Sequence, residues 1–263
     1  MSTASEAFKA GRLADATAAA IEQVRNNPAD RGKRFFLAEL FVFAGDLERA
    51  DKQLDVLFQP DAADLVAVTL FRQLIRAETA RREVFAQGRL PEFLTQPGDH
   101  VKLHLEAAIR LRENKPAEAA ELLAKAEVLR PAVAGTCDGA AFDDFRDLDD
   151  LSAPVFEVLT ANGNYYWVPL ETVELVEFHK PDRARDLYWR PAHMVVKDGP
   201  DGVVYVPTLY HGSHAADEAL KLGRGTAWDG GDTTPYRGRG LREFLVGDSA
   251  KTVMEIGKIE FKK

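Results

Sequence analysis

Gly11–Ala16 reads GRLADA, and Gly45–Ala50, 34 residues further along the chain, reads GDLERA. In each copy a glycine, which commonly follows the end of a helix, stands just before residues with helical apolar spacing. A period of 34 residues with small residues at the helix crossings is typical of tetratricopeptide repeats, which are stacked pairs of helices. These two stretches therefore predict a helical repeat array in the first half of the chain.

A third, weaker copy lies at Asn114–Ala119 (NKPAEA), and the intervening Gln87–Gly98 is predicted to be a loop because it carries two glycines and two prolines. Stacked helix pairs form a concave surface that commonly holds a peptide or a helix of a partner. The repeat register makes Phe35, Phe36 and Phe43 candidate partner-binding residues on that surface. The alternative, a helical half that only supports the second half, remains open.

The pattern changes after Pro131, where glycines and an acidic stretch, Asp138–Glu157, interrupt the helical spacing. Polar and apolar residues then alternate over Thr172–Phe178, which predicts a strand with one buried face. Further strands are expected over residues 190–196, 203–207, 242–246 and 253–259, and short helices over residues 152–160 and 217–222. The sequence therefore predicts an α+β protein, with a tetratricopeptide-like helical domain at residues 1–134 and a smaller β-rich mixed domain at residues 135–263.

Three consecutive aromatics stand at the start of a predicted strand, in Asn162–Leu170 (NGNYYWVPL). Since neighbours along a strand point to opposite faces, Tyr166 should face away from Tyr165 and Trp167. Pro169 cannot donate to a strand ladder, which indicates a sheet edge or a strand end. A structural role is the main interpretation of these residues, and a contact with a partner or between domains is the alternative.

The same structural interpretation applies to a second motif, which contains Asp186, Trp189, Arg190 and Pro191. Trp228 differs, because it stands among glycines and aspartates that give it little means of burial. We therefore expect Trp228 at the surface, as a further candidate partner-binding residue.

Charge and composition exclude several classes of function. The chain carries 34 Lys+Arg against 42 Asp+Glu, a net charge of −8, and has no basic footprint for nucleic acid. It shows no apolar run long enough to cross a membrane and no secretory signal. Cys137 is the one cysteine, which suits a reducing compartment. A cytoplasmic location is the expectation.

The search for catalytic and metal motifs leads to a negative prediction. The six histidines include no H-E-x-x-H, and the chain has neither a Walker loop nor a G-x-S-x-G elbow. Gly223–Gly225 is only a weak candidate for a phosphate cradle, and the acidic stretch lacks EF-hand spacing, so we expect it to be solvated or to face a partner. No catalytic residue, metal or cofactor is predicted. The alternative is an enzyme in the β-rich domain that uses His193, His211 or His214 with nearby acids.

Several motifs resemble those of the ImpE-like family, also called SciE-type or TagJ proteins. The most specific are Asn162–Leu170, Asp186–Ala192 (DLYWRPA) and Leu222–Trp228 (LGRGTAW), and the likeness covers nearly the whole chain. At Asp144 the chain departs from the family, which often carries tryptophan there.

This resemblance implies a non-catalytic accessory protein of bacterial type VI secretion systems. Family members have a tetratricopeptide-like helical part and a mixed C-terminal domain. Some bind a helix near the N-terminus of the small subunit of the contractile sheath, and they are thought to assist sheath assembly or its recycling by an AAA+ ATPase. A generic peptide-binding repeat scaffold is the alternative. The oligomeric state is left open.

Overall fold

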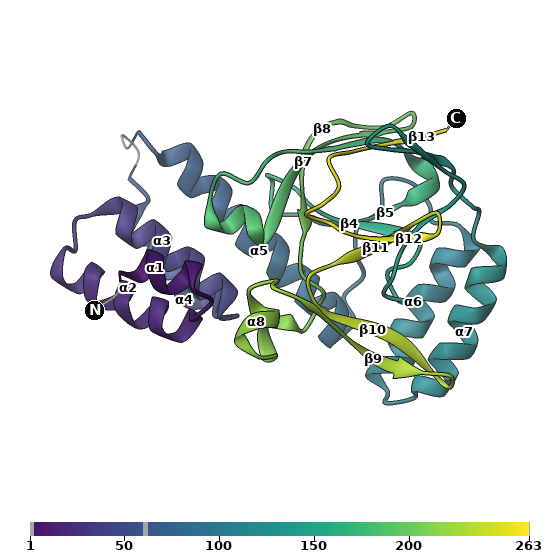
Figure 1. Cartoon of the computed structure of the whole chain (residues 1–263), viewed down its shortest axis with the longest axis horizontal. Helices are drawn as coiled ribbons and strands as arrows, with labels where there is room; N and C mark the ends of the chain where they lie inside the picture. The colour runs from purple at the N-terminus through teal and green to yellow at the C-terminus, as the bar shows by residue number, and fades with distance from the viewer. Residues whose placement is uncertain (1–2, 60–62, 263) are drawn as a thin grey trace.

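The computed structural model of the protein describes residues 3–59 and 63–262. The chain begins with helices and ends with antiparallel strands, as the predicted α+β class requires. Figure 1 shows α1 to α4 gathered on the left of the view, with α5 leading from them to the sheet and α6 and α7 on the right. The helices are α1 (Ala4–Lys9), α2 (Leu13–Asn26), α3 (Arg31–Phe43), α4 (Leu47–Leu57), α5 (Leu65–Gln87), α6 (Asp99–Arg112) and α7 (Pro116–Leu129).

The two copies of the sequence repeat fold alike. Gly11 and Gly45 adopt left-handed backbone angles, with φ of 83° and 85°, directly after the ends of α1 and α3. Only glycine adopts this conformation without strain, so each helix ends where the glycine stands. The next helices begin at Leu13 and Leu47, and Asp46 caps the second of them by accepting from the N–H of Arg49.

The strands form one large sheet, a smaller sheet and a hairpin. The large sheet has the order β2-β1-β13-β6-β7-β8-β4-β5, the smaller one β12-β11-β3, and β9 pairs with β10. The strands are β1 (Gly135–Cys137), β2 (Ala140–Phe142), β3 (Phe145–Asp147), β4 (Val155–Leu159), β5 (Tyr165–Pro169), β6 (Val173–Phe178), β7 (Trp189–Val196), β8 (Asp201–Pro207), β9 (Thr226–Gly231), β10 (Thr234–Gly240), β11 (Glu243–Val246), β12 (Ser249–Thr252) and β13 (Lys258–Phe261). Short helices η1 (Leu170–Thr172), η2 (Ala184–Leu187), η3 (Ser213–Ala215) and α8 (Glu218–Lys221) connect them.

One buried cluster joins the helices to the sheet. It runs from α1 through α5 and continues into Val155 and Leu159 of β4, Trp167 of β5 and Trp189 of β7. A second cluster lies on the opposite face of the same strands, with Phe156, Val158 and Val168 among its members. The predicted domain boundary at residue 134 stays a prediction, and apolar packing crosses it.

Two of the predicted elements are wrong. Residues 152–160 were expected to be helical, but Val155–Leu159 is strand β4, buried on both faces. Its continuous apolar run suits a strand between two cores, which periodicity alone does not distinguish from a buried helix. The strand expected over 253–259 is instead a turn followed by β13. The carbonyls of Val253 and Ile256 point inward to the guanidinium of Arg190, at 2.5 and 2.8 Å.

The other predicted strands coincide with β6, β7, β8 and β11, and the helix expected over 217–222 is α8. Residues 88–98 form no helix, as predicted for this loop. In the described part of the chain, no helix combines the length and the apolar character needed to span a bilayer.

Candidate functional site

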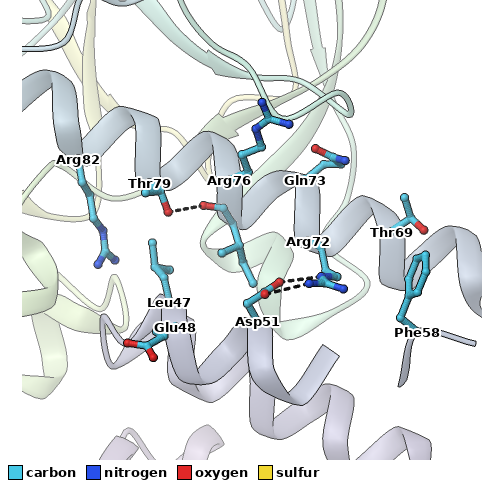
Figure 2. Close-up of a pocket in the computed structure, with 11 residues that line it drawn as sticks. Leu47, Glu48, Asp51, Phe58, Thr69, Arg72, Gln73, Arg76, Thr79 and Arg82 are labelled. Atoms are coloured by element: carbon cyan, nitrogen blue, oxygen red, sulfur yellow. Dashed lines mark hydrogen bonds and ion pairs between the residues drawn. The ribbon is translucent and has the colours of Figure 1, made fainter. Parts of the chain in front are cut away.

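A groove of about 790 Å³ lies between α4 and α5, and we call it the α4–α5 groove. Figure 2 shows α5 running along the groove with α4 opposite it. Because α5 is 23 residues long, only part of its surface is covered by the other helices and the sheet. The lining residues are Leu47, Glu48, Asp51, Phe58, Thr69, Arg72, Gln73, Ile75, Arg76, Thr79 and Arg82.

The uncovered face of α5 is polar. Thr69, Arg72, Arg76 and Thr79 recur at intervals of three or four residues, which places them along one side of the helix. From Thr69 to Arg82 this side measures about 20 Å, at about 1.5 Å per residue. The groove is therefore long enough to lie along several turns of a partner helix.

An ion pair spans the groove between its two helices. Arg72 donates from Nε and Nη2 to both carboxylate oxygens of Asp51, at 2.8 and 3.0 Å, and from Nη1 to Asp55 at 2.9 Å. Phe58, with 48% of its surface exposed, provides an apolar contact at one end. Arg76 leaves α5 on the side away from α4 in Figure 2 and forms no hydrogen bond or ion pair with another described residue. The groove thus offers a partner an apolar anchor beside the Arg72 ion pair.

The four predicted partner-binding residues do not lie together. Phe35 and Phe36 are half-buried on α3 and line a different hollow, which also contains Arg183. Phe43 is fully buried against Phe8 and Tyr188, so it presents no surface to a partner in this structure.

Trp228 lies far from those three along the fold, on the β9–β10 hairpin beside α7. It is 38% exposed and packs edge-on against Tyr210, with ring centroids 5.4 Å apart. The residues predicted for one surface thus occupy three separate places.

The three consecutive aromatics alternate between the two cores. Tyr165 and Trp167 are buried towards α5, and Tyr166 is half-buried on the opposite face. The indole Nε1 of Trp167 donates to the hydroxyl of Tyr165 at 2.7 Å, and that hydroxyl donates to Glu157. Pro169 ends β5, the edge strand of the large sheet, and the backbone of Glu92 covers that edge.

These aromatics surround a buried set of charges that we call the buried junction. Arg81 of α5 donates from Nε and Nη2 to Glu157 of β4, at 2.7 and 3.0 Å. Arg242 donates to Asp147 at 2.8 Å and also to Glu157. All four side chains are at most 2% exposed. The junction therefore ties the helical half to both sheets.

The prediction of a solvated acidic stretch is wrong for part of that stretch. Asp147 and Asp149 are buried, because Arg242 and Arg237 from distant parts of the chain reach them. Burial alone would raise the pKa of Glu157, but the attraction of Arg81 and Arg242 is greater and lowers it well below its usual value. For Asp147, burial outweighs the attraction of Arg242 and raises its pKa to about 6.

The second motif also bridges the two halves. Trp189 donates from its indole nitrogen to Glu78 of α5 at 3.2 Å, and Arg190 holds the turn before β13. Asp186 accepts from two backbone N–H groups of the preceding loop, and the Pro191 carbonyl accepts from the N–H of His179. Each of these four residues has a contact that fixes the chain locally.

The histidines of the enzyme alternative have separate partners. His193 lies on β7 with Nε2 2.5 Å from a carboxylate oxygen of Asp201. His211 is stacked on Phe85 with ring centroids 4.4 Å apart, and burial lowers its pKa to about 3. His214 lies nearby, its ring 6.4 Å from that of His211. Among the described residues, no group of three or more His, Cys, Asp or Glu side chains is placed to hold a metal ion.

Two features were missed in the sequence. The helical spacing of the polar residues on α5 can be read in the sequence. The sequence does not indicate, however, that this side of the helix is left uncovered by the rest of the fold. The second is a set of caps: Arg224 donates to the carbonyls of Phe8 and Lys9, at 3.0 and 2.6 Å, and Glu218 accepts from the N–H of Ala14 at 2.7 Å. Arg224 thus caps the end of α1 in a segment predicted as a weak phosphate cradle.

Comparisons with known proteins find a matching family model, a curated relative and a similar solved structure. The family model described as "ImpE protein" matches residues 139–260. The type VI secretion system accessory component TagJ of Pseudomonas aeruginosa is 36% identical over 230 residues, covering 86% of this chain and 80% of that protein. The crystal structure of protein VPA1032 from Vibrio parahaemolyticus superposes with a TM-score of 0.92 at 26% identity, over 99% of this chain and 97% of the other. A likeness of this extent in sequence shows that the chain belongs to the ImpE family, the family of TagJ.

Proposed function

We propose that this protein is a non-catalytic accessory component of a bacterial type VI secretion system that works in the cytoplasm. Its likeness to TagJ, an accessory component by name, supports that role. In this proposal the protein binds an amphipathic helix near the N-terminus of the small sheath subunit, and so modulates sheath assembly or its ATPase-driven recycling.

The observation that carries the proposal is the α4–α5 groove. It is the largest of the hollows described above, and Thr69, Arg72 and Thr79 of its polar stripe on α5 are exposed or partly exposed. A bound helix would place apolar residues at i, i+3 or i+4 and i+7 against Phe58, Leu47 and Ile75, and polar residues beside the α5 stripe. Ordering of the peptide offsets part of the contact energy, so the affinity should be modest.

The test is a calorimetric titration of the full chain with a peptide of the first helix of the cognate small sheath subunit. We expect a dissociation constant on the order of 1–10 μM. Phe58→Asp should weaken binding about tenfold, because a charge would replace the exposed apolar anchor. Val128→Asp is the matched control: Val128 is 85% exposed on α7, outside the groove.

Three results would contradict the proposal. Absence of binding would remove the sheath helix as the partner. An equal loss of affinity in both variants would move the contact away from the groove. Equal binding of an unrelated amphipathic peptide of the same charge would support the generic peptide-binding scaffold instead.

A further inference from the structure

Another hollow, of about 280 Å³, lies between α7 and the β9–β10 hairpin, and we call it the α7–hairpin hollow. In Figure 1 the hairpin runs towards α6 and α7 at the lower right, and β10 packs against α7. Side chains of α7 form an apolar wall, and charged side chains stand around the hollow. It is formed by different residues from the α4–α5 groove.

The floor of this hollow includes a buried imidazole with one unused nitrogen. His104 of α6 lines the hollow and is only 2% exposed, and its Nδ1 lies 3.0 Å from the carbonyl oxygen of Leu151. Because a carbonyl oxygen can only accept, Nδ1 carries the proton and donates it. Nε2 therefore has a lone pair, and no described residue donates to it. A buried acceptor without a donor costs free energy, which the N–H group of a ligand would restore.

The imidazole of His104 stays neutral near pH 7. Burial lowers its pKa to about 4, although the hydrogen bond to Leu151 acts in the opposite direction. Arg146 and Glu127 also act on the charge of this imidazole, and both line the same hollow. The lone pair of Nε2 is therefore available at neutral pH to a donor that enters the hollow.

The hollow carries more negative than positive charge. Glu127, Asp150 and Asp232 line it, and Arg146 is the one cation among its described lining residues, which leaves a net charge of −2. Arg146 donates to Asp150 at 2.9 Å and lies 3.6 Å from Glu127. These contacts use part of two carboxylates, and the surplus of negative charge remains.

A further arginine near the hollow does not remove this surplus. Arg130 pairs with Glu127 at 2.9 Å and also with Asp144 at 2.5 Å, so it brings one positive and one negative charge to the same place. The surroundings therefore favour a positively charged ligand.

Asp232 is the second unpartnered acceptor of the hollow. It is exposed in the turn of the hairpin and forms no hydrogen bond or ion pair with another described residue. Tyr236, 49% exposed on β10, presents an aromatic ring beside it in the lining, and such a ring attracts a cation over its face. The hollow thus has an unused acceptor at its floor and another at its rim.

We infer that the α7–hairpin hollow binds a small aliphatic diamine as its dication. One ammonium group would donate to Nε2 of His104, near the carboxylates of Glu127 and Asp150, and the other would pair with Asp232. The methylene groups between them would pack against Leu123 and the alanines of α7. A dication matches the charge of −2, and an anion would be repelled.

The size of the hollow favours a free molecule over a single side chain. A cavity of about 150 Å³ holds benzene, so 280 Å³ has room for roughly ten non-hydrogen atoms. A lysine side chain fills only about half of that space. This inference goes beyond the proposed function and does not depend on the sheath subunit.

The first experiment follows the imidazole ¹⁵N signals of the full chain by long-range ¹H–¹⁵N NMR during titration with 1,5-diaminopentane. The pH is neutral, where both amines are protonated, and the ionic strength is constant. We expect a saturable shift of the Nε2 signal of His104, with a dissociation constant of about 1 mM. His193 is the matched control and should not shift, because it lies outside the hollow beside Asp201.

Asp232→Asn tests the rim without disturbing the buried imidazole. It should raise the dissociation constant about fivefold, because one exposed charge pair is lost. Asp248→Asn is the matched control: it removes the same charge from the exposed turn between β11 and β12, outside the hollow, and should leave the affinity unchanged. An equal response of the two variants would show that Asp232 does not contact the ligand.

Three other outcomes would overturn the inference. The neutral analogue 1,5-pentanediol should leave the Nε2 signal in place, and an equal response to it would show that charge is not recognised. Pentylamine binding as tightly as the diamine would show that a second ammonium group is not recognised. Absence of a saturable shift up to about 100 mM would mean that the hollow is not a ligand site.

The source of the ammonium group is tested with N-acetyllysine N-methylamide, which carries one ammonium group on a peptide backbone. Binding about tenfold weaker than that of the diamine supports a free diamine. Equal affinity would instead assign the hollow to a lysine side chain of a partner polypeptide. Because none of these probes derives from the sheath, the inference and the proposed function can fail separately.

Discussion

The buried junction and the α4–α5 groove are built from the same kinds of residue and differ in their contact with water. Arg81, Arg242, Asp147 and Glu157 are at most 2% exposed. In the groove the side chain of Arg72 is 30% exposed and that of Asp51 36% exposed. Both sets contain close arginine–carboxylate pairs. Only the second set is open to solvent and to a partner.

This difference decides what each set of charges does. In the junction water cannot replace a lost partner, so each charge depends on the others and the set holds α5 to the sheets. In the groove water competes for every pair, so the pairs contribute little to stability and exchange readily for contacts with a partner. The same chemistry therefore fixes the fold in one region and leaves a binding surface in the other.

Among the substitutions considered, Glu157→Ala in the buried junction should lower the stability of the protein most. It leaves two buried guanidinium groups short of a partner, and we expect the free energy of unfolding to fall by about 3–5 kcal/mol. Urea denaturation followed by circular dichroism measures the change. Asp55→Ala is the control, since Asp55 is 69% exposed beside Arg72. If both variants lose less than about 1 kcal/mol, the junction is not what joins the two halves.

Glu39 sharpens the comparison, because it is a buried carboxyl without a close ion pair. The unfolded chain releases this proton near pH 4.5, whereas the folded protein holds it up to about pH 7. The contribution of Glu39 to the free energy of unfolding should therefore be greatest below pH 4.5. It should decrease by about 3 kcal/mol as the pH rises to 7. Glu39→Gln should remove this decrease.

The measurement is the difference in unfolding free energy between wild type and Glu39→Gln at several pH values. Asp147, with its pKa near 6, titrates in both proteins and cancels in the difference. A constant difference between pH 4.5 and 7 would show that the proton of Glu39 is not held more tightly in the folded state.

Asp51→Ala should have the smallest effect on stability. The pair with Arg72 is half-open to water, so we expect a loss of less than about 1 kcal/mol, reduced further in high salt. The affinity for the sheath peptide should change more than the stability, because Arg72 loses the contact that fixes it in the groove. A loss of stability above about 2 kcal/mol would show that the Asp51–Arg72 pair stabilises the fold as a buried ion pair does, and not as an exposed one.

The sequence predicted what depends on local spacing. Gly11 and Gly45 marked the helix ends, and the alternation at Tyr165, Tyr166 and Trp167 predicted which faces those side chains occupy. These features depend on backbone conformation over a few residues, which the local sequence determines.

The sequence did not predict what depends on distant partners. Asp147 is buried because Arg242, 95 residues away, pairs with it, and an acidic stretch alone carries no sign of that arginine. Phe43 and Phe35 share one helix, yet Tyr188 from the second half covers Phe43 and leaves Phe35 beside a hollow. The α4–α5 groove likewise depends on which side of α5 the sheet leaves open.

The caps on the first helices set an order of events during synthesis. Arg224 and Glu218 close the ends of α1 and α2 across 216 and 204 residues of chain. On the ribosome, α1 emerges early with its local caps, Thr3 and Gly11, but the contacts from Arg224 and Glu218 form only when almost the whole chain has been made. Contacts that close such long loops form late in folding. The N-terminal helices should therefore be the last part of the molecule to become resistant to proteases, although they are the first to be translated.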